Sequence, residues 1–146
     1  MSVTELEQDK SEIRALIDAQ RYPEALERLN PLLAQHPTDD ELYSLRGITN
    51  NLWHEYTQAE VDLKKAIELK PSKGAYHHDI GLLYLDMDET EKAIDAFHRA
   101  LHIDPNDLST NIHVYASLAQ AGRIDEAIDG LEALDTEHPG NELERF

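Results

Sequence analysis

Residues 80–105 read IGLLYLDMDETEKAIDAFHRALHIDP, and three positions in this stretch recur along the chain at one fixed spacing. Ala93, Phe97 and Pro105 each have a counterpart 34 residues away in both directions. The three columns are Ala25, Ala59, Ala93 and Ala127; Leu29, Leu63, Phe97 and Leu131; and Pro37, Pro71, Pro105 and Pro139. Three columns in phase at this period are typical of a stacked array of helix-turn-helix units. Each unit is too small to bury its own apolar face, so it must pack against its neighbours.

Each unit is expected to hold two helices, and the prolines mark where units end. A proline ends the helix before it because it donates no amide hydrogen and restricts the preceding residue. Thr38, Ser72 and Asn106 directly follow three of the prolines and are predicted to cap the next helices, and Thr4 and Glu7 are predicted to form a capping box. The pattern predicts helices near residues 5–19, 23–35, 39–53, 57–69, 73–86, 90–103, 107–120 and 124–137, and no strand.

Small residues indicate where the two helices of a unit approach closely. The alanine column lies near the start of each second helix, and Gly47 and Gly81 lie opposite it in the first helices of the two middle units. Ile13 and Tyr115 take the glycine position in the first and last units. We expect these bulkier side chains to open the local packing or to shift the helices.

These residues also resemble a known family, the tetratricopeptide repeats, in four tandem copies over essentially the whole chain. The resemblance is carried by Ile80 to Tyr84, Ala93, Phe97, Ala100 and Pro105 in the third unit, and by Tyr43, Gly47, Tyr56, Ala59, Leu63, Ala66 and Pro71 in the second. It implies an all-α fold, a right-handed superhelical α-solenoid whose first helices line a concave groove. It divides a single domain into repeats at about 5–38, 39–72, 73–106 and 107–140, with a short stub over residues 140–146.

Polar residues at both ends favour a complete four-unit array. Gln8 and Glu12 stand where inner units have apolar side chains, and Asp135 and Glu137 do the same in the last unit. We therefore expect Asp135 and Glu137 to be exposed. The apolar counterparts expected to be mostly buried are Ile67, Leu69, Leu101 and Ile103. A monomer is the preferred expectation, and a dimer formed through Leu143 and Phe146 is the alternative.

Composition excludes several classes of function. The chain has 30 acidic and 13 basic residues and a formal net charge of −17. Such a charge repels phosphate backbones and anionic lipid, so neither nucleic acid nor a membrane is an expected ligand. The absence of cysteine excludes disulfides and thiolate chemistry. The opening residues MSVTELEQDK resemble no secretory signal, and we expect a cytoplasmic protein.

No motif in the sequence predicts an enzyme, and we expect no catalytic residue, no cofactor and no metal. His98 and His102 have the spacing of two metal ligands, but two exposed histidines are the more common outcome. A His78–Asp79 pair near His113 has the groups for acid–base chemistry, although a hydrogen-bonded groove wall is the favoured interpretation. Trp53 is expected to pack in the core rather than to anchor a ligand.

The resemblance makes the groove the expected binding site. The residues predicted to contact a peptide are Arg14, Asn51, Leu52, His78, Asp79, Leu85 and His113. Apolar contact is expected from Leu45 as well as from Leu52 and Leu85, and the partner segment is expected to be neutral or basic. In co-chaperones of this family, Lys, Arg and Asn clamp a terminal carboxylate. Of those positions only Lys10 matches here, and Asp79 stands where an arginine is required.

The sequence therefore favours a protein-interaction module, a scaffold or chaperone-like adaptor that binds a peptide or partner protein. Two alternatives stay open. One is a chaperone like those of class II in type III secretion, which are also small, acidic and built of similar repeats. The other is a self-assembling structural scaffold.

Overall fold

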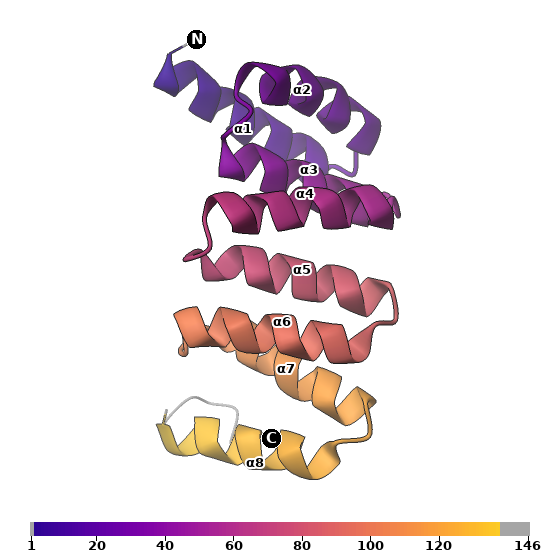
Figure 1. The fold of residues 1–146 in the computed structure, drawn as a ribbon, viewed down its shortest axis with the longest axis vertical. Coiled ribbons are helices and arrows are strands. Elements are labelled where there is room, and N and C mark those ends of the chain that lie inside the picture. The colour runs from indigo at the N-terminus through magenta and orange to yellow at the C-terminus, as the bar shows by residue number, and fades with distance from the viewer. Residues whose placement is uncertain (1, 138–146) are drawn as a thin grey trace.

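The chain forms eight consecutive helices over the residues that the computed structural model describes, which are 2–137, with side chains described for 2–134 (Figure 1). The helices are α1 Val3–Asp18, α2 Tyr22–Gln35, α3 Asp40–Leu52, α4 Tyr56–Leu69, α5 Gly74–Asp86, α6 Thr90–Ile103, α7 Leu108–Gln120 and α8 Ile124–Glu137. Every boundary lies within two residues of the predicted one. Residues 2–137 contain no strand, so the all-α prediction is confirmed.

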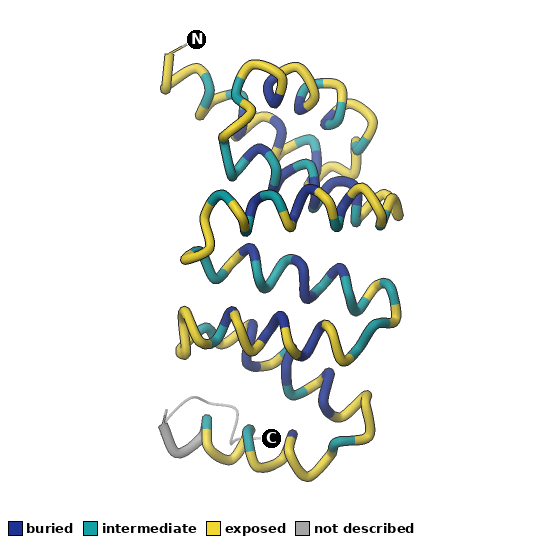
Figure 2. Tube along the Cα trace, in the orientation of Figure 1, coloured by how far each residue is buried: buried dark blue, intermediate teal, exposed yellow. Residues whose placement is uncertain are grey.

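The helices stack along one axis, from α1 at one end to α8 at the other (Figure 1). Buried positions repeat along each inner helix, as Figure 2 shows in dark blue. They form three core clusters, built by α1 with α2 and α3, by α4 with α5 and α6, and by α6 with α7 and α8. Each cluster joins neighbouring helices only, which is the packing of an α-solenoid.

Within the middle pairs, glycine opposite a large side chain brings the helices together. A Cβ atom on Gly47 would lie 2.7 Å from Leu63 Cγ, and one on Gly81 would lie 2.5 Å from Phe97 Cε1. Leu63 and Phe97 are fully buried, as are Ala59 and Ala93. The predicted close crossing at these columns is confirmed.

In the last pair, the glycine and the large side chain that meet at the crossing have exchanged helices. Tyr115 on α7 takes the glycine position, and the glycine is on α8 instead, because a Cβ atom on Gly130 would lie 2.0 Å from Tyr115 Cε1. The residue that continues the Leu63 and Phe97 column, Leu131, is 48% exposed. The column therefore continues in the sequence but not in the core.

Each pair turns through one residue with a left-handed backbone, and these residues share the 34-residue period. They are Gln20 with φ 61°, His54 with φ 64°, Asp88 with φ 59° and Gly122 with φ 82°. A left-handed residue after the last turn ends a helix and favours glycine. The sequence analysis did not recognise this column because only its last member is glycine.

The predicted caps are wrong by one or two residues. Asp39 and Asp107, not Thr38 and Asn106, accept the capping hydrogen bonds of α3 and α7. Lys73, not Ser72, precedes α5 and supplies no side-chain cap. The capping box at the first helix joins Ser2 and Glu5, since that helix begins at Val3.

Some burial predictions also fail. Trp53, expected in the core, is 45% exposed because it is the residue that ends α3. Ile103 is 38% exposed at the end of α6, whereas Ile67, Leu69 and Leu101 are mostly buried, as predicted. Gln8 and Glu12 are exposed as expected. The side chains of Asp135 and Glu137, together with Leu143 and Phe146, lie outside the described part of the chain.

Candidate functional site: a hollow on the first-helix face

A hollow of about 310 Å³ opens where the first helices of three consecutive pairs face one another. Its lining comes from α3, α5 and α7, with one residue of α4 at its base. The lining residues are Ile48, Asn51, Leu52, Leu63, Asp79, Leu82, Leu85, Asp86 and His113. We call it the central hollow. Its walls are aliphatic side chains, interrupted by two carboxyl groups, an amide and an imidazole.

Asp79 is the most unusual group in the central hollow. It is half-buried, and its carboxyl group makes no hydrogen bond or ion pair with any described residue. Burial raises the pKa of Asp79 to about 6, and the charge of Lys73 opposes this only weakly. A carboxyl group withdrawn from water without a partner is destabilised in its charged form. Such groups cluster at functional sites.

Asn51 and Leu52 form the opposite wall. The side-chain oxygen of Asn51 is buried and accepts no hydrogen bond from a described residue. Leu52 is 44% exposed, so its apolar surface is available to a ligand. A buried amide oxygen without a donor costs free energy that a ligand donor would recover.

His78 and His113 belong to an aromatic cluster with Phe97 beside the central hollow. The His78 ring lies 5.0 Å from that of His113 and 5.6 Å from that of Phe97, centroid to centroid. The His113 ring stacks on Phe97 at 5.7 Å. The expectation that His78 lies near His113 is therefore confirmed.

The hydrogen bonds of His78 define its protonation. The Thr110 hydroxyl donates to Asp107 at 2.7 Å, so its oxygen accepts from His78 Nδ1 at 3.2 Å. His78 Nε2 is buried and has no hydrogen-bond partner among the described residues. Burial lowers the pKa of His78, as does the neighbouring His113, while Asp107 opposes the shift. His78 is therefore a neutral wall group, and the interpretation as acid–base machinery gains no support from its contacts.

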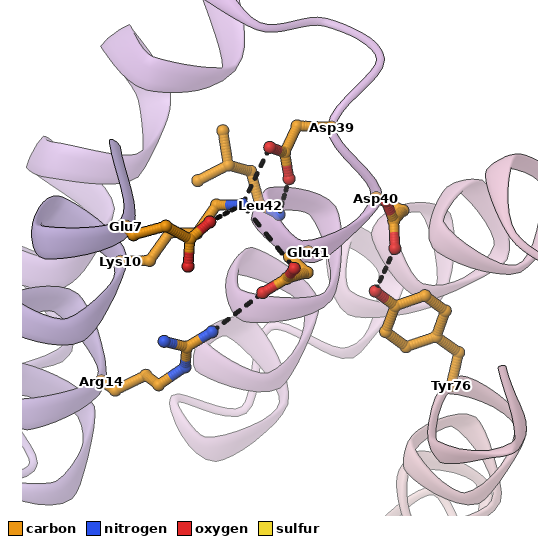
Figure 3. A network of polar contacts seen from close by, with 8 residues as sticks. All are labelled: Glu7, Lys10, Arg14, Asp39, Asp40, Glu41, Leu42 and Tyr76. Carbon is orange, nitrogen blue, oxygen red and sulfur yellow. Dashed lines mark hydrogen bonds and ion pairs between the residues drawn. The ribbon is translucent and has the colours of Figure 1, made fainter. Parts of the chain in front are cut away.

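At the N-terminal end of the same face, the charges are already paired (Figure 3). Lys10 is 3% exposed, and its ammonium group lies 2.9 Å from Asp39, 3.4 Å from Glu7 and 3.8 Å from Glu41. Burial alone would lower the pKa of Lys10, but these carboxylates raise it above its usual value. Arg14 lies 3.0 Å from Glu41.

Figure 3 also shows the link from the second pair to the third, in which the Tyr76 hydroxyl donates to Asp40. Burial acts to raise the pKa of Asp40. The Tyr76 hydrogen bond, the backbone and the charges of Lys70 and Lys73 nevertheless hold that pKa below its usual value. These contacts join neighbouring units, and the polar groups that form them are therefore already paired within the chain.

The structure thus divides the predicted binding residues. Five of the seven line the central hollow together: Asn51, Leu52, Asp79, Leu85 and His113. His78 lies beside it, and Arg14 lies outside its lining. The expectation that Leu45 provides apolar contact to a peptide is wrong, because Leu45 is packed in the core of the first three helices.

Sequence reasoning missed Leu63 at the base of the hollow, because Leu63 is on a second helix. It also missed the pair of Asp62 with Arg46. Asp62 is 1% exposed and accepts from the Arg46 guanidinium at 2.9 and 2.8 Å, and these two residues are on different helices. Only the 16-residue separation, one helix and a turn, hints at that pairing.

The described residues form neither a metal-binding cluster nor a membrane-spanning helix. No three His, Cys, Asp or Glu side chains among residues 2–134 are grouped so as to hold a metal ion. None of the described helices is long and apolar enough to cross a membrane.

Known proteins share both the sequence pattern and the shape. A family model described as Tetratricopeptide repeat matches residues 75–107. The crystal structure of MamA has a TM-score of 0.80 and 26% identity, over 90% of this chain and 77% of that one. The chain belongs to the tetratricopeptide repeat family.

Individual tetratricopeptide relatives differ in how much of them is matched. The Hsp70-Hsp90 organizing protein of Triticum aestivum is 30% identical over 112 residues, which are 77% of this chain and 19% of that protein. The chain thus spans about a fifth of that relative's length. The first tetratricopeptide domain of Spaghetti, bound to the HSP90 peptide SRMEEVD, has a TM-score of 0.73 and 18% identity, over 83% of this chain and 95% of that one. At that identity the likeness concerns the fold.

Proposed function

We propose that this tetratricopeptide chain is a non-enzymatic protein-interaction module that holds a peptide segment of a partner protein in the central hollow. The observation that carries the proposal is the hollow itself. It combines exposed apolar surface on Leu52 with polar groups on Asn51 and Asp79 that no described side chain pairs. Peptide sites use apolar contact for affinity and polar groups for orientation. The Spaghetti domain, of the same fold, is bound to a peptide.

The mode of binding differs from capture of a terminal carboxylate. Lys10 is the one residue that matches the co-chaperone clamp, and three carboxylates of this chain surround it. A ligand carboxylate would have to displace them. The central hollow, with two aspartates, repels an anion as well. We therefore expect a neutral or basic internal segment as the ligand; a cytoplasmic location and the absence of nucleic-acid binding stay predictions.

The test is a selection of displayed random peptides on the purified chain, followed by calorimetric titration of the selected peptides. Asn51→Ala, Leu85→Ala and His113→Ala are each expected to weaken binding about fivefold or more, because central contacts dominate such interfaces. Val61→Ala is the matched control, since Val61 is an apolar residue of α4 that is 58% exposed and outside the hollow lining.

Unchanged affinity in all three variants, with helicity intact by circular dichroism, would overturn the proposal. The alternative binding site would then be a hollow of about 250 Å³ between α4, α5 and α6. That hollow is lined by Lys64, Lys92 and Arg99 among others, and it would suit an acidic partner instead.

One observation favours self-assembly as a second candidate function. Five large apolar side chains of the last pair are 44–56% exposed: Leu108, Ile112, Ile124, Ile128 and Leu131. An exposed apolar face of this kind is typical of an interaction surface. Sedimentation velocity over a hundredfold range of concentration tests it. A concentration-dependent sedimentation coefficient that Ile128→Asp abolishes would support assembly, and a constant monomer value would exclude it.

A further inference from the structure

The central hollow contains two acceptor groups that no described residue of the chain pairs with. The Asp79 carboxyl group has no hydrogen-bond or ion-pair partner among the described residues, and the Asn51 side-chain oxygen is buried without a donor. Asp86 lies at the same hollow and adds negative charge. None of the lysine or arginine side chains that the structure describes lines it. The acceptors of the hollow therefore lack a hydrogen-bond donor among the described residues, and its negative charges lack a positive one. A cationic donor would supply both.

The shape of the hollow restricts what the donor can be. Ligand pockets span roughly 300–1,000 Å³, and at about 310 Å³ this hollow is at the lower limit. One long side chain suits it better than a separate cofactor. Its walls are the aliphatic side chains of Leu52, Leu82 and Leu85. Lysine and arginine have an apolar stem and a charged end, and such side chains bury the stem against apolar surface.

We propose that the central hollow receives a lysine or arginine side chain of the partner peptide, with its cationic end paired to Asp79 and its stem against Leu52, Leu82 and Leu85. The proposal rests on the function proposed above and names the chemistry of the partner at that site. An apolar side chain in the same place would displace water and leave the carboxyl and amide oxygens unpaired, which costs free energy. An anionic side chain would meet two carboxylates.

The free chain gives a second reason to expect a cation. Burial raises the pKa of Asp79 to about 6, so at neutral pH the carboxylate is ionised at a cost in stability. A bound cation removes that cost. Affinity should therefore fall as pH drops from 7 to 5, because Asp79 must give up its proton to bind. The other ionisable groups at or near this site are Lys73, His78, Asp86 and His113.

The experiment is a double-mutant cycle on a peptide selected as above. Its central lysine or arginine is replaced by norleucine, which keeps an unbranched apolar stem and removes the charge. Against the wild-type chain, this replacement is expected to weaken binding about tenfold or more, because close charge pairs in interfaces couple strongly. Against Asp79→Asn, it should weaken binding less than twofold. Asp95→Asn, the same change at an exposed position outside the hollow lining, should behave as wild type.

Three results would overturn the inference. The first is an equal loss on norleucine replacement in wild type and Asp79→Asn. The second is a set of selected peptides that need Leu85 but contain no basic residue. The third is a pH dependence between 5 and 7 that Asp79→Asn leaves unchanged, since a group other than Asp79 would then be its source. In each case, binding that still depends on Leu85 and Asn51 leaves the proposed peptide-binding function of the central hollow intact. If no selected peptide depends on these two residues, both that function and the basic side chain proposed for the hollow are wrong.

Discussion

Two regions of the array each withdraw an aspartate from water, and they treat it in opposite ways. Between α3 and α4, Asp62 is 1% exposed and accepts four hydrogen bonds: two from Arg46, one from Asn50 at 3.2 Å and one from Gln58 at 3.3 Å. In the central hollow, Asp79 is half-buried and accepts none from a described side chain. The same residue type thus completes a structural network in one region and stays unpaired in the other.

The difference separates structural charge from available charge. A buried carboxylate with a full set of donors is balanced within the chain, and removing a donor should destabilise the fold. A carboxylate without donors already destabilises the fold, and neutralising it should stabilise the chain. Lys10, with three carboxylates around it, belongs with Asp62. By this criterion the charge of Lys10, at the N-terminal end of this face, is structural, and that of Asp79, in the central hollow, is not balanced by any described side chain.

The largest expected effect is at the paired aspartate. Arg46→Met removes the guanidinium and leaves Asp62 buried with only two amide donors. We expect the free energy of unfolding to fall by about 3 kcal/mol, as when one partner of a buried ion pair is lost. Urea unfolding measures the change. Arg21→Met is the control, because the Arg21–Glu24 pair is exposed and should contribute less than about 0.5 kcal/mol. Equal effects of both substitutions would remove the distinction between the two regions.

The second prediction has the opposite sign and concerns Asp79. Asp79→Asn should raise the free energy of unfolding at pH 7 by roughly 1–3 kcal/mol, since each pKa unit corresponds to about 1.4 kcal/mol. The pKa is raised from 3.8 to about 6 in the folded chain. The destabilisation by Asp79 is therefore absent below pH 3.8, grows between pH 3.8 and 6, and is constant above.

The measurement is urea unfolding of wild type and Asp79→Asn at several pH values from 3.5 to 8. The two curves should meet at the acid end and separate as pH rises through the window above. Asp95→Asn, an exposed residue, should run parallel to wild type. A variant less stable than wild type at pH 7 would mean that the Asp79 carboxylate has a stabilising partner after all.

The third prediction tests a hydrogen bond between units. Tyr76→Phe removes the hydroxyl that donates to Asp40, at a position where Tyr76 is 2% exposed. We expect a loss of about 1.5 kcal/mol at pH 7, at the low end of the range for a hydrogen bond to a charged group. The folded pKa of Asp40 lies below its usual value. The stabilisation is therefore present above the unfolded pKa of 3.8 and is lost as pH falls through the folded pKa. A Tyr76→Phe loss of unchanged size at pH 3 would contradict this origin.

The sequence predicted the fold well because period and residue size carry it. Gly47 and Gly81 recur at the helix crossings, and the positions of these crossings determine how the remaining helices can pack. The failures occur where two residues compete for one role. Thr38 and Asp39 are both good caps, and only the chain geometry selects Asp39. Trp53 is one residue beyond α3, and a shift of one residue there turned an expected core side chain outward.

The sequence placed most of the residues that line the candidate site side by side, but it did not predict which of their polar groups are paired. Asn51, Leu52, Asp79, Leu85 and His113 follow from the helix period and from the family resemblance, which places first helices along the groove. The sequence does not show which charged side chains lack an ion-pair partner, because the ion pairs join residues of different units. Lys10 and Asp39 are 29 residues apart, and Arg14 and Glu41 are 27 apart. No local pattern distinguishes Arg14, which is paired, from Asp79, which is not.

The smallest expected effect therefore concerns Arg14, which the sequence placed in the binding site. Arg14 is exposed, and its contact with Glu41 at 3.0 Å is a surface ion pair. Arg14→Ala should change the free energy of unfolding by no more than about 0.5 kcal/mol, because solvent screens such pairs. It should also leave the affinity for a groove-selected peptide within twofold of wild type, since Arg14 does not line the central hollow. Titration against the same peptide as for Leu85→Ala decides the second point. A loss as large as that of Leu85→Ala would extend the binding site along the groove to the first helix, and the N-terminal end would then have to be counted as available charge rather than structural charge.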